Sequence, residues 1–198
     1  MSNEQIAKAA FIYSRQQIHL KSSNKVDYRK AENETYVTKH NQSFDQSKIM
    51  VSWVKKNIDT LTLADVSEKT RASGAGNCMG YAAVALHHMR TVGGARKTHS
   101  GYVSVDGCDH AFAQVGFPVP PNGEYPIDFD DWGDAWIADG WANICCPARE
   151  FRMRLTEKMS KWSQNKKIIE NPYADIDPAE WVNEVPSAKK IHSAVFDR

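Results

Sequence analysis

The chain has 198 residues, a length that suits one domain with its own hydrophobic core. Its hydrophobic content of 41% supports such a core, and its net charge of +1 argues against the strongly basic surface of a nucleic-acid-binding protein. No apolar run approaches the roughly 20 residues of a membrane-spanning helix, and residues 1–5 lack the features of a signal peptide. We therefore expect a protein that is cytoplasmic as made, or is exported by a route that needs no cleaved signal.

Four cysteines bear on the redox state and on metal binding. Adjacent Cys145 and Cys146 cannot easily pair with each other, and the cysteine count is low for a disulfide scaffold, so we expect reduced thiols. A zinc site built from Cys108, His110, Cys145 and Cys146 is the alternative. It lacks the spacer of two to four residues that usually separates paired zinc ligands. The sequence therefore predicts no metal and no organic cofactor.

The first third of the chain predicts helices joined by polar segments. Apolar residues recur with helical spacing over residues 2–20, where Ser2 can cap the helix, and again over 43–59. Residues 21–43 are polar and predict loop, with a short strand at 35–38. Residues 71–76 predict a glycine-bearing turn.

The middle of the chain predicts a helix followed by antiparallel strands. Small and apolar residues over 77–92 indicate a helix pressed against a sheet, and Gly93-Gly94 end it. Asp106-Gly107 predicts a hairpin turn. The expected strands cover 97–105, 108–117 and 135–139.

The rest of the chain predicts a long insert, a helix and a tail. The Pro-rich and acidic insert 118–133 is longer than a hairpin needs, so we expect it to border a functional site. A helix is expected over 147–167, and a short one at 177–182, where Asp177 caps and Pro178 occupies the first turn. The predicted class is α+β, a single domain 1–198 with its core over about 44–170, an N-terminal helical extension over 1–43 and a C-terminal tail over 171–198.

Three residues fit a Cys-His-Asp catalytic site. Cys78 falls at the start of the predicted helix, where free N–H groups and the helix dipole favour the thiolate and could hold an oxyanion. His110 begins one predicted strand and Asp139 ends the next, so antiparallel pairing would set them side by side. For the acid that orients the histidine, Asp134 is the alternative to Asp139.

Motifs over residues 74–146 resemble the core of the transglutaminase-like superfamily, within the broader papain-like group of cysteine proteases. They follow the family's order, although Gly140 stands where the family usually has proline. The matching stretches are Gly76–Ala82 around the cysteine, Met89–Arg96 across the end of the helix, Gly101-Tyr102, Asp109–Phe112 around the histidine, and Trp136–Trp141 around the aspartate.

The resemblance implies a papain-like or transglutaminase-like core, with a central helix packed on an antiparallel sheet and flanking helices. It implies that Cys78 is the nucleophile, His110 the general base and acid, and Asp139 the residue that orients His110. Bacterial effectors and toxins with such cores act as thiol proteases or glutamine deamidases, so the expected partner is a protein substrate. Transglutaminase-type acyl transfer and a catalytically inactive binding module of the same fold are the alternatives.

The resemblance also points to groups that would hold the oxyanion or the substrate. Relatives often supply an upstream Trp or Gln, and Trp53 is the candidate here, with a plain core tryptophan as its alternative role. Asn77 and Trp141 are the other expected oxyanion or substrate-binding residues. The backbone N–H of Cys78 would be a second donor.

Overall fold

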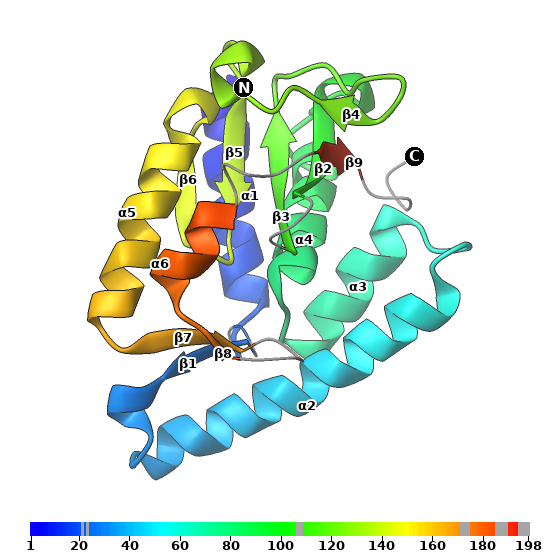
Figure 1. Ribbon diagram of the computed structural model, residues 1–198. Helices are drawn as coiled ribbons and strands as arrows, with labels where there is room; N and C mark the ends of the chain where they lie inside the picture. Colours follow the sequence, from blue (N-terminus) through cyan, green and yellow to red (C-terminus); the bar gives the residue numbers. More distant parts are fainter. Residues whose placement is uncertain (21, 23, 106–108, 171–174, 185–189, 194–198) are drawn as a thin grey trace.

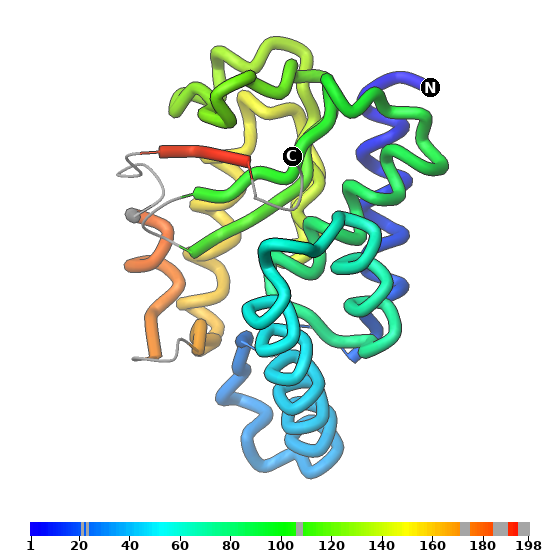
Figure 2. Tube along the Cα trace, turned by 90° about the vertical axis from the view of Figure 1, so that its right-hand side faces the viewer, coloured from blue at the N-terminus to red at the C-terminus, as the bar shows by residue number. Residues whose placement is uncertain are grey.

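The computed structural model describes residues 1–20, 22, 24–105, 109–170, 175–184 and 190–193. Within them the protein is α+β and layered, as the sequence predicts (Figures 1 and 2). An antiparallel sheet lies between two helices on one face and two on the other. On the first face are α1 (Asn3–Gln17) and α4 (Cys78–Thr91); on the second are α5 (Phe151–Gln164) and α6 (Pro178–Trp181).

The main sheet sets the strands that carry the candidate site next to each other. Its strand order is β4-β9-β2-β3-β5-β6, and all of the neighbours are antiparallel. The central pair follows the predicted hairpin register, with Val105 opposite His110; residues 106–107 themselves lie outside the described part of the chain. The strands are β2 (Ser100–Val105), β3 (His110–Val115), β4 (Glu124–Tyr125), β5 (Trp136–Asp139), β6 (Ile144–Pro147) and β9 (Ile191–Ser193).

Helix α4 is the central helix of the core. Residues on nearly all of its sides are buried, including Tyr81, Leu86 and Met89, and it contacts β2, β3, β5, α1 and α3. Small side chains permit this close approach: Ala82 and Ala85 on the helix, and Ala111 on β3, are each less than 5% exposed. The predicted limits of 77–92 are thus confirmed to within one residue at each end.

The segment before α4 differs from the prediction. Residues 35–38 are not a strand, because α2 (Glu34–Asn57) begins there, where the Asn33 side chain accepts a hydrogen bond from Tyr36 N at 2.9 Å. Residues 71–73 are not part of a turn but the last turn of α3 (Leu63–Ser73). That helix has a capping box at its start, and Gly74 ends it with a φ of 64°.

A second sheet forms from three short strands that the sequence does not predict. β1 (Lys25–Asp27) pairs antiparallel with β7 (Lys167–Glu170), which pairs in turn with β8 (Asp175–Ile176). Its strands come from both ends of the sequence, and local periodicity is weak in pieces this short. β1 of the predicted N-terminal extension and β8 of the predicted C-terminal tail therefore flank β7 on its two sides (Figure 1).

The insert does not lie where we expected it. It leaves β3 after Val115, at the opposite end of that strand from His110, and folds over this end of the sheet (Figure 1). Phe129 and Trp132 of the insert are buried, and both rings pack against Phe112. The acidic insert thus caps the core away from His110 instead of bordering the predicted triad.

The predicted C-terminal helices are both present. α5 is shorter than the expected 147–167, and a single 3-10 turn over Ala148–Glu150 precedes it. α6 begins as predicted: Asp177 accepts a hydrogen bond from Ala179 N at 2.7 Å, and Pro178 occupies the first turn.

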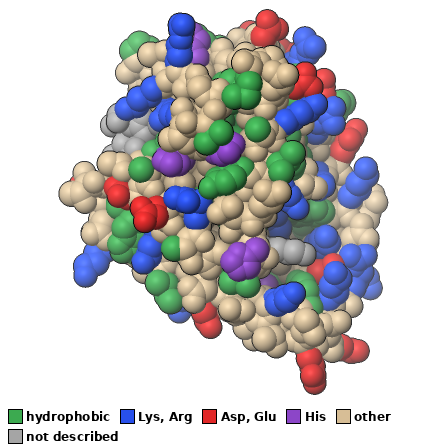
Figure 3. Space-filling view, turned by 180° about the vertical axis from the view of Figure 1, so that it is seen from behind, with side chains coloured by type: hydrophobic (Ala, Val, Ile, Leu, Met, Phe, Trp, Pro, Cys, Tyr) green, Lys and Arg blue, Asp and Glu red, His purple; other side chains and the backbone are tan. Residues whose placement is uncertain are grey.

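Two further features are the distribution of charge on one face and the length and polarity of the helices. Acidic and basic side chains are interspersed on the face seen from behind (Figure 3). Among the residues that the structure describes, no helix is both long enough and apolar enough to cross a bilayer.

Candidate active site

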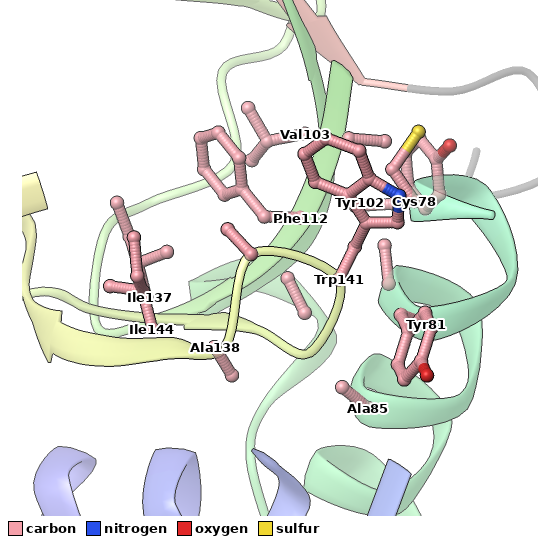
Figure 4. Close-up of a cluster of buried hydrophobic side chains, with 14 of the residues drawn as sticks. Cys78, Tyr81, Ala85, Tyr102, Val103, Phe112, Ile137, Ala138, Trp141 and Ile144 are labelled. Atoms are coloured by element: carbon pink, nitrogen blue, oxygen red, sulfur yellow. The ribbon is translucent and has the colours of Figure 1, made fainter. Parts of the chain in front are cut away.

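Cys78 stands at the first position of α4, at the end of the core helix (Figure 4). Asn77 is the N-cap residue, and its side-chain oxygen accepts from Gly80 N at 3.4 Å. Among the described residues, neither the Cys78 nor the Met79 N–H group donates a hydrogen bond. The sulfur therefore sits beside free helix-terminal donors, the environment that favours a thiolate and an oxyanion.

His110 and Asp139 meet as the sequence predicts. β3 and β5 are antiparallel neighbours, so the first residue of one strand and the last residue of the other lie together. The His110 Nε2 to Asp139 Oδ2 distance is 2.7 Å, and each residue is only 1% exposed. Asp139 Oδ1 in turn accepts from Ala142 N at 2.8 Å, so both carboxylate oxygens are held.

The carboxylate fixes which ring nitrogen can act as a base. An ionised carboxylate only accepts hydrogen bonds, so Nε2 carries hydrogen and Nδ1 is left for proton transfer. Nδ1 is buried and makes no hydrogen bond with any described residue, the Cys78 sulfur included. The Cys78 thiol is close enough to influence the imidazole, and Nδ1 is the nitrogen that remains for it.

Opposing effects set the charge of the imidazole. Burial lowers the pKa of His110, but the charge and hydrogen bond of Asp139, followed by the nearby Cys78, outweigh it and raise the pKa to about 10. An imidazolium is therefore favoured at neutral pH.

The backbone before His110 also contacts the thiol. Asp109 has a φ of 47°, a left-handed conformation that is uncommon for residues other than glycine, and its carbonyl accepts from Cys78 Sγ at 3.4 Å. Cys78 is only 7% exposed. Thus the thiol is enclosed, and it donates to a backbone carbonyl next to His110.

Aromatic rings enclose the imidazole. The ring centroid of Trp141 lies 5.1 Å from that of His110, and Trp181 of α6 meets the imidazole edge-on at 5.2 Å. Tyr102 on β2 is buried nearby, and its pKa is raised by burial first and then by Cys78 and Asp109. These contacts restrict the orientations of His110 and exclude water around it.

The three residues predicted to bind the oxyanion or the substrate lie in different parts of the structure. Asn77 is next to Cys78 and half-buried. The indole N–H of Trp141 already donates to Asn24 Oδ1 at 2.8 Å, so its ring supports His110 while its donor is engaged. Trp53 is half-buried on α2, where Lys69 Nζ of α3 lies 5.6 Å from its ring centroid. The oxyanion role of Trp53 remains a prediction.

The remaining sequence alternatives find less support in the geometry. Asp134 is exposed, whereas Asp139 makes the hydrogen bond to His110. Cys145 and Cys146 are adjacent on β6, so their side chains point to opposite faces of the sheet. Cys108 lies outside the described residues, and among those described no group of three potential metal ligands gathers.

The structure gives a reason for Gly140, the departure from the resembled pattern. A Cβ added there would lie 2.5 Å from Tyr81 Cδ1 and 2.8 Å from Ser14 Oγ. The turn after Asp139 thus presses against α4 and α1 so closely that no side chain fits without a shift. Glycine is required by packing at this position.

Sequence reasoning missed several neighbours of the candidate site residues. Lys25 and Asn24 lie in the stretch that was predicted to be loop, and Trp181 lies in the predicted tail. The cap and proline of α6 predicted the helix of Trp181 but not its contact with His110. No local pattern links residues that are this far apart in the chain.

No family model, no curated protein and no solved structure matches this chain in the comparisons.

Proposed function

We propose that this protein is a thiol-dependent amide hydrolase with a Cys78-His110-Asp139 triad on a papain-like or transglutaminase-like core. The single observation that supports this most is the buried 2.7 Å contact between His110 Nε2 and Asp139 Oδ2, with Cys78 at the adjoining helix start. Purely structural packing gives little reason to bury a charged pair beside a thiol. The proposed substrate is a protein, attacked at a side-chain or main-chain amide.

The reaction follows from the roles of the three groups. His110 Nδ1 takes the proton of Cys78 Sγ, and the sulfur attacks the amide carbonyl carbon, with the oxyanion held by the Cys78 N–H. His110 then gives that proton to the leaving nitrogen, so the C–N bond breaks and a thioester remains. Water, deprotonated by His110, attacks the thioester and releases the acid and the free thiol. Asp139 keeps the imidazole in the required tautomer throughout.

Intact-mass spectrometry of a general protein substrate such as casein tests the proposal. Hydrolysis of a side-chain amide raises the mass by about one dalton per event, whereas peptide-bond hydrolysis gives fragments. We expect Cys78→Ala to lose all activity and Cys145→Ala, which changes a half-buried thiol on β6, to retain it. Cross-linked species would instead indicate acyl transfer to lysine.

A measurement without substrate covers the case in which casein is not accepted. In the proposed enzyme, iodoacetamide alkylates Cys78 near pH 6 faster than a free thiol, whose pKa is about 8.5. His110→Ala should abolish that advantage. If wild-type Cys78 reacts no faster than a free thiol, the protein is better described as a binding module.

A further inference from the structure

The turn after Asp139 is held by the N-terminal part of the chain. Arg15 of α1 donates from Nη1 to the Gly140 carbonyl at 3.1 Å, and Lys25 of β1 donates from Nζ to the Trp141 carbonyl. Asn24 accepts the indole N–H of Trp141 at 2.8 Å. Two successive carbonyls thus each receive a cationic donor, and the indole is fixed separately. Arg15, Asn24 and Lys25 all come from the first 25 residues of the chain.

Lys25 occupies an unusual place for a lysine. Its Nζ lies 4.6 Å from the ring centroid of Trp141 and 4.7 Å from that of Trp162. Burial lowers its pKa to about 7, an effect that Asp139 opposes. Of the other groups that act on it, Arg15 and Lys167 lower this pKa further and Cys78 raises it slightly.

Burying a lysine at this site lowers the stability of the fold, so its ammonium group needs an explanation. Enclosing an ammonium between indoles costs hydration, which the cation–π contacts and one carbonyl offset only in part. A methionine or leucine would fill the space with less penalty. The feature that an apolar side chain could not supply is a donor aimed at the Trp141 carbonyl.

The same turn carries the groups that orient His110. Asp139 precedes it, Ala142 N within it holds Asp139 Oδ1, and the Trp141 ring packs on the imidazole. A shift of this turn would therefore move the Asp139 carboxylate and the Trp141 ring together. A displacement of about 1 Å can lower a catalytic rate about 100-fold.

We propose that Arg15 and Lys25 are positioning residues, which hold the turn after Asp139 so that its carboxylate stays on His110 Nε2. This inference rests on the proposed triad. It assigns to the N-terminal segment a part in the active site, because the donors that fix the triad's turn come from α1 and β1.

The pH profile of Cys78 alkylation by iodoacetamide, read by peptide mass spectrometry on the full chain, tests this role. We expect Lys25→Met and Arg15→Met each to lower the rate near pH 6 about tenfold and to move the profile toward that of a free thiol. Lys25→Arg and Arg15→Lys, which keep a cationic donor, should restore most of the rate. Lys8→Met is the matched control, because Lys8 also lies over a tryptophan, 5.5 Å from the Trp136 ring centroid, but away from the triad.

Thermal unfolding of each variant shows whether it is folded. Arg15 is exposed on α1, so Arg15→Met carries the test if Lys25→Met does not fold. If folded Lys25→Met and Arg15→Met both keep the wild-type alkylation profile while His110→Ala shifts it, the positioning role is wrong. The proposed triad would still stand. A wild-type protein whose profile is that of a free thiol, and is unchanged in His110→Ala, would instead refute the proposed function.

Discussion

At the scale of single residues, the site depends on how burial and charge compete at His110. Burial alone would favour the neutral imidazole, but a carboxylate 2.7 Å away reverses this and raises the pKa to about 10. The carboxylate is in turn held by Ala142 N. The surroundings of His110 thus favour the imidazolium that the proposed mechanism forms when His110 takes the Cys78 proton.

The His110–Asp139 pair should make stability depend on pH. The folded pKa of about 10 lies above the unfolded value of 6.5, so the pair's contribution is fully present below about pH 6.5 and is lost as the pH rises toward 10. We expect Asp139→Asn to remove this loss and to lower the free energy of unfolding by about 2 kcal/mol near pH 6. Urea unfolding at several pH values measures it.

Asp134→Asn is the control for this prediction, since Asp134 is exposed and has no contact with His110 in the described structure. Its unfolding curve should follow that of the wild type at every pH. Equal pH dependence in Asp139→Asn and the wild type would show that the pair is not charged as proposed.

Asn77 allows capping and catalysis to be separated. Its side-chain oxygen caps α4, while its amide donor is the part that would contact an oxyanion. Asn77→Asp keeps the capping oxygen, so we expect the free energy of unfolding to change by less than about 0.5 kcal/mol. Hydrolytic activity should fall about 100-fold because a donor is replaced by a negative charge. Full activity in Asn77→Asp would remove this residue from the oxyanion site.

At the scale of elements, the turn between β5 and β6 links the triad to the core helix. Gly140 lies against Tyr81 of α4 and Ser14 of α1, while Arg15 binds its carbonyl. Packing of this turn against α4 and α1, together with the hydrogen bond from Arg15, fixes the position of Asp139. The orientation of the acid is thus a property of three elements and not of β5 alone.

Gly140→Ala tests this packing. The added methyl would overlap the Tyr81 ring, so we expect the free energy of unfolding to fall by about 1–3 kcal/mol and Cys78 alkylation to slow as the turn moves. Gly94→Ala is the comparison: no atom lies within 4 Å of its added Cβ, and only its φ of 70° is strained. It should lose stability without any change in alkylation. The same alkylation rate in Gly140→Ala and the wild type would argue against a link between this turn and the triad.

At the scale of the whole molecule, both ends of the chain converge on one site. β1 near the start of the chain pairs with β7, and α6 near its end places Trp181 on His110. β9 lies between β4 and β2 in the main sheet. The segments outside the resembled motifs thus complete the enclosure of the proposed triad.

Trp181→Ala should therefore destabilise the whole fold. Trp181 is 5% exposed and packs against Trp141 at 5.4 Å as well as His110, so we expect the free energy of unfolding to fall by about 3–5 kcal/mol. Denaturant unfolding followed by circular dichroism measures it. Trp136→Ala, at a half-buried site, should cost less. A loss below about 1 kcal/mol for Trp181→Ala would mean that α6 is not part of the cooperative core.

Much of the central fold could be predicted because its signals are local. The helix from Cys78 and the strands from Ser100 and His110 follow from periodicity, turn residues and small side chains. Given an antiparallel hairpin and its next neighbour, the meeting of His110 and Asp139 follows from strand order alone. The strand predicted at 35–38 was wrong because the cap at Asn33 and the helical packing of α2 outweigh four residues of β propensity.

The sequence by itself determined which residues form the central helix and strands, and thereby brought the imidazole and carboxylate together. Only the tertiary structure decided that Lys25, Arg15 and Trp181 surround them, and that the acidic insert lies at the other end of β3. The physical reason is the distance along the chain over which each kind of interaction acts. Secondary-structure preferences act over a few residues, whereas burial, carbonyl hydrogen bonds and ring contacts join groups that only the folded chain brings close.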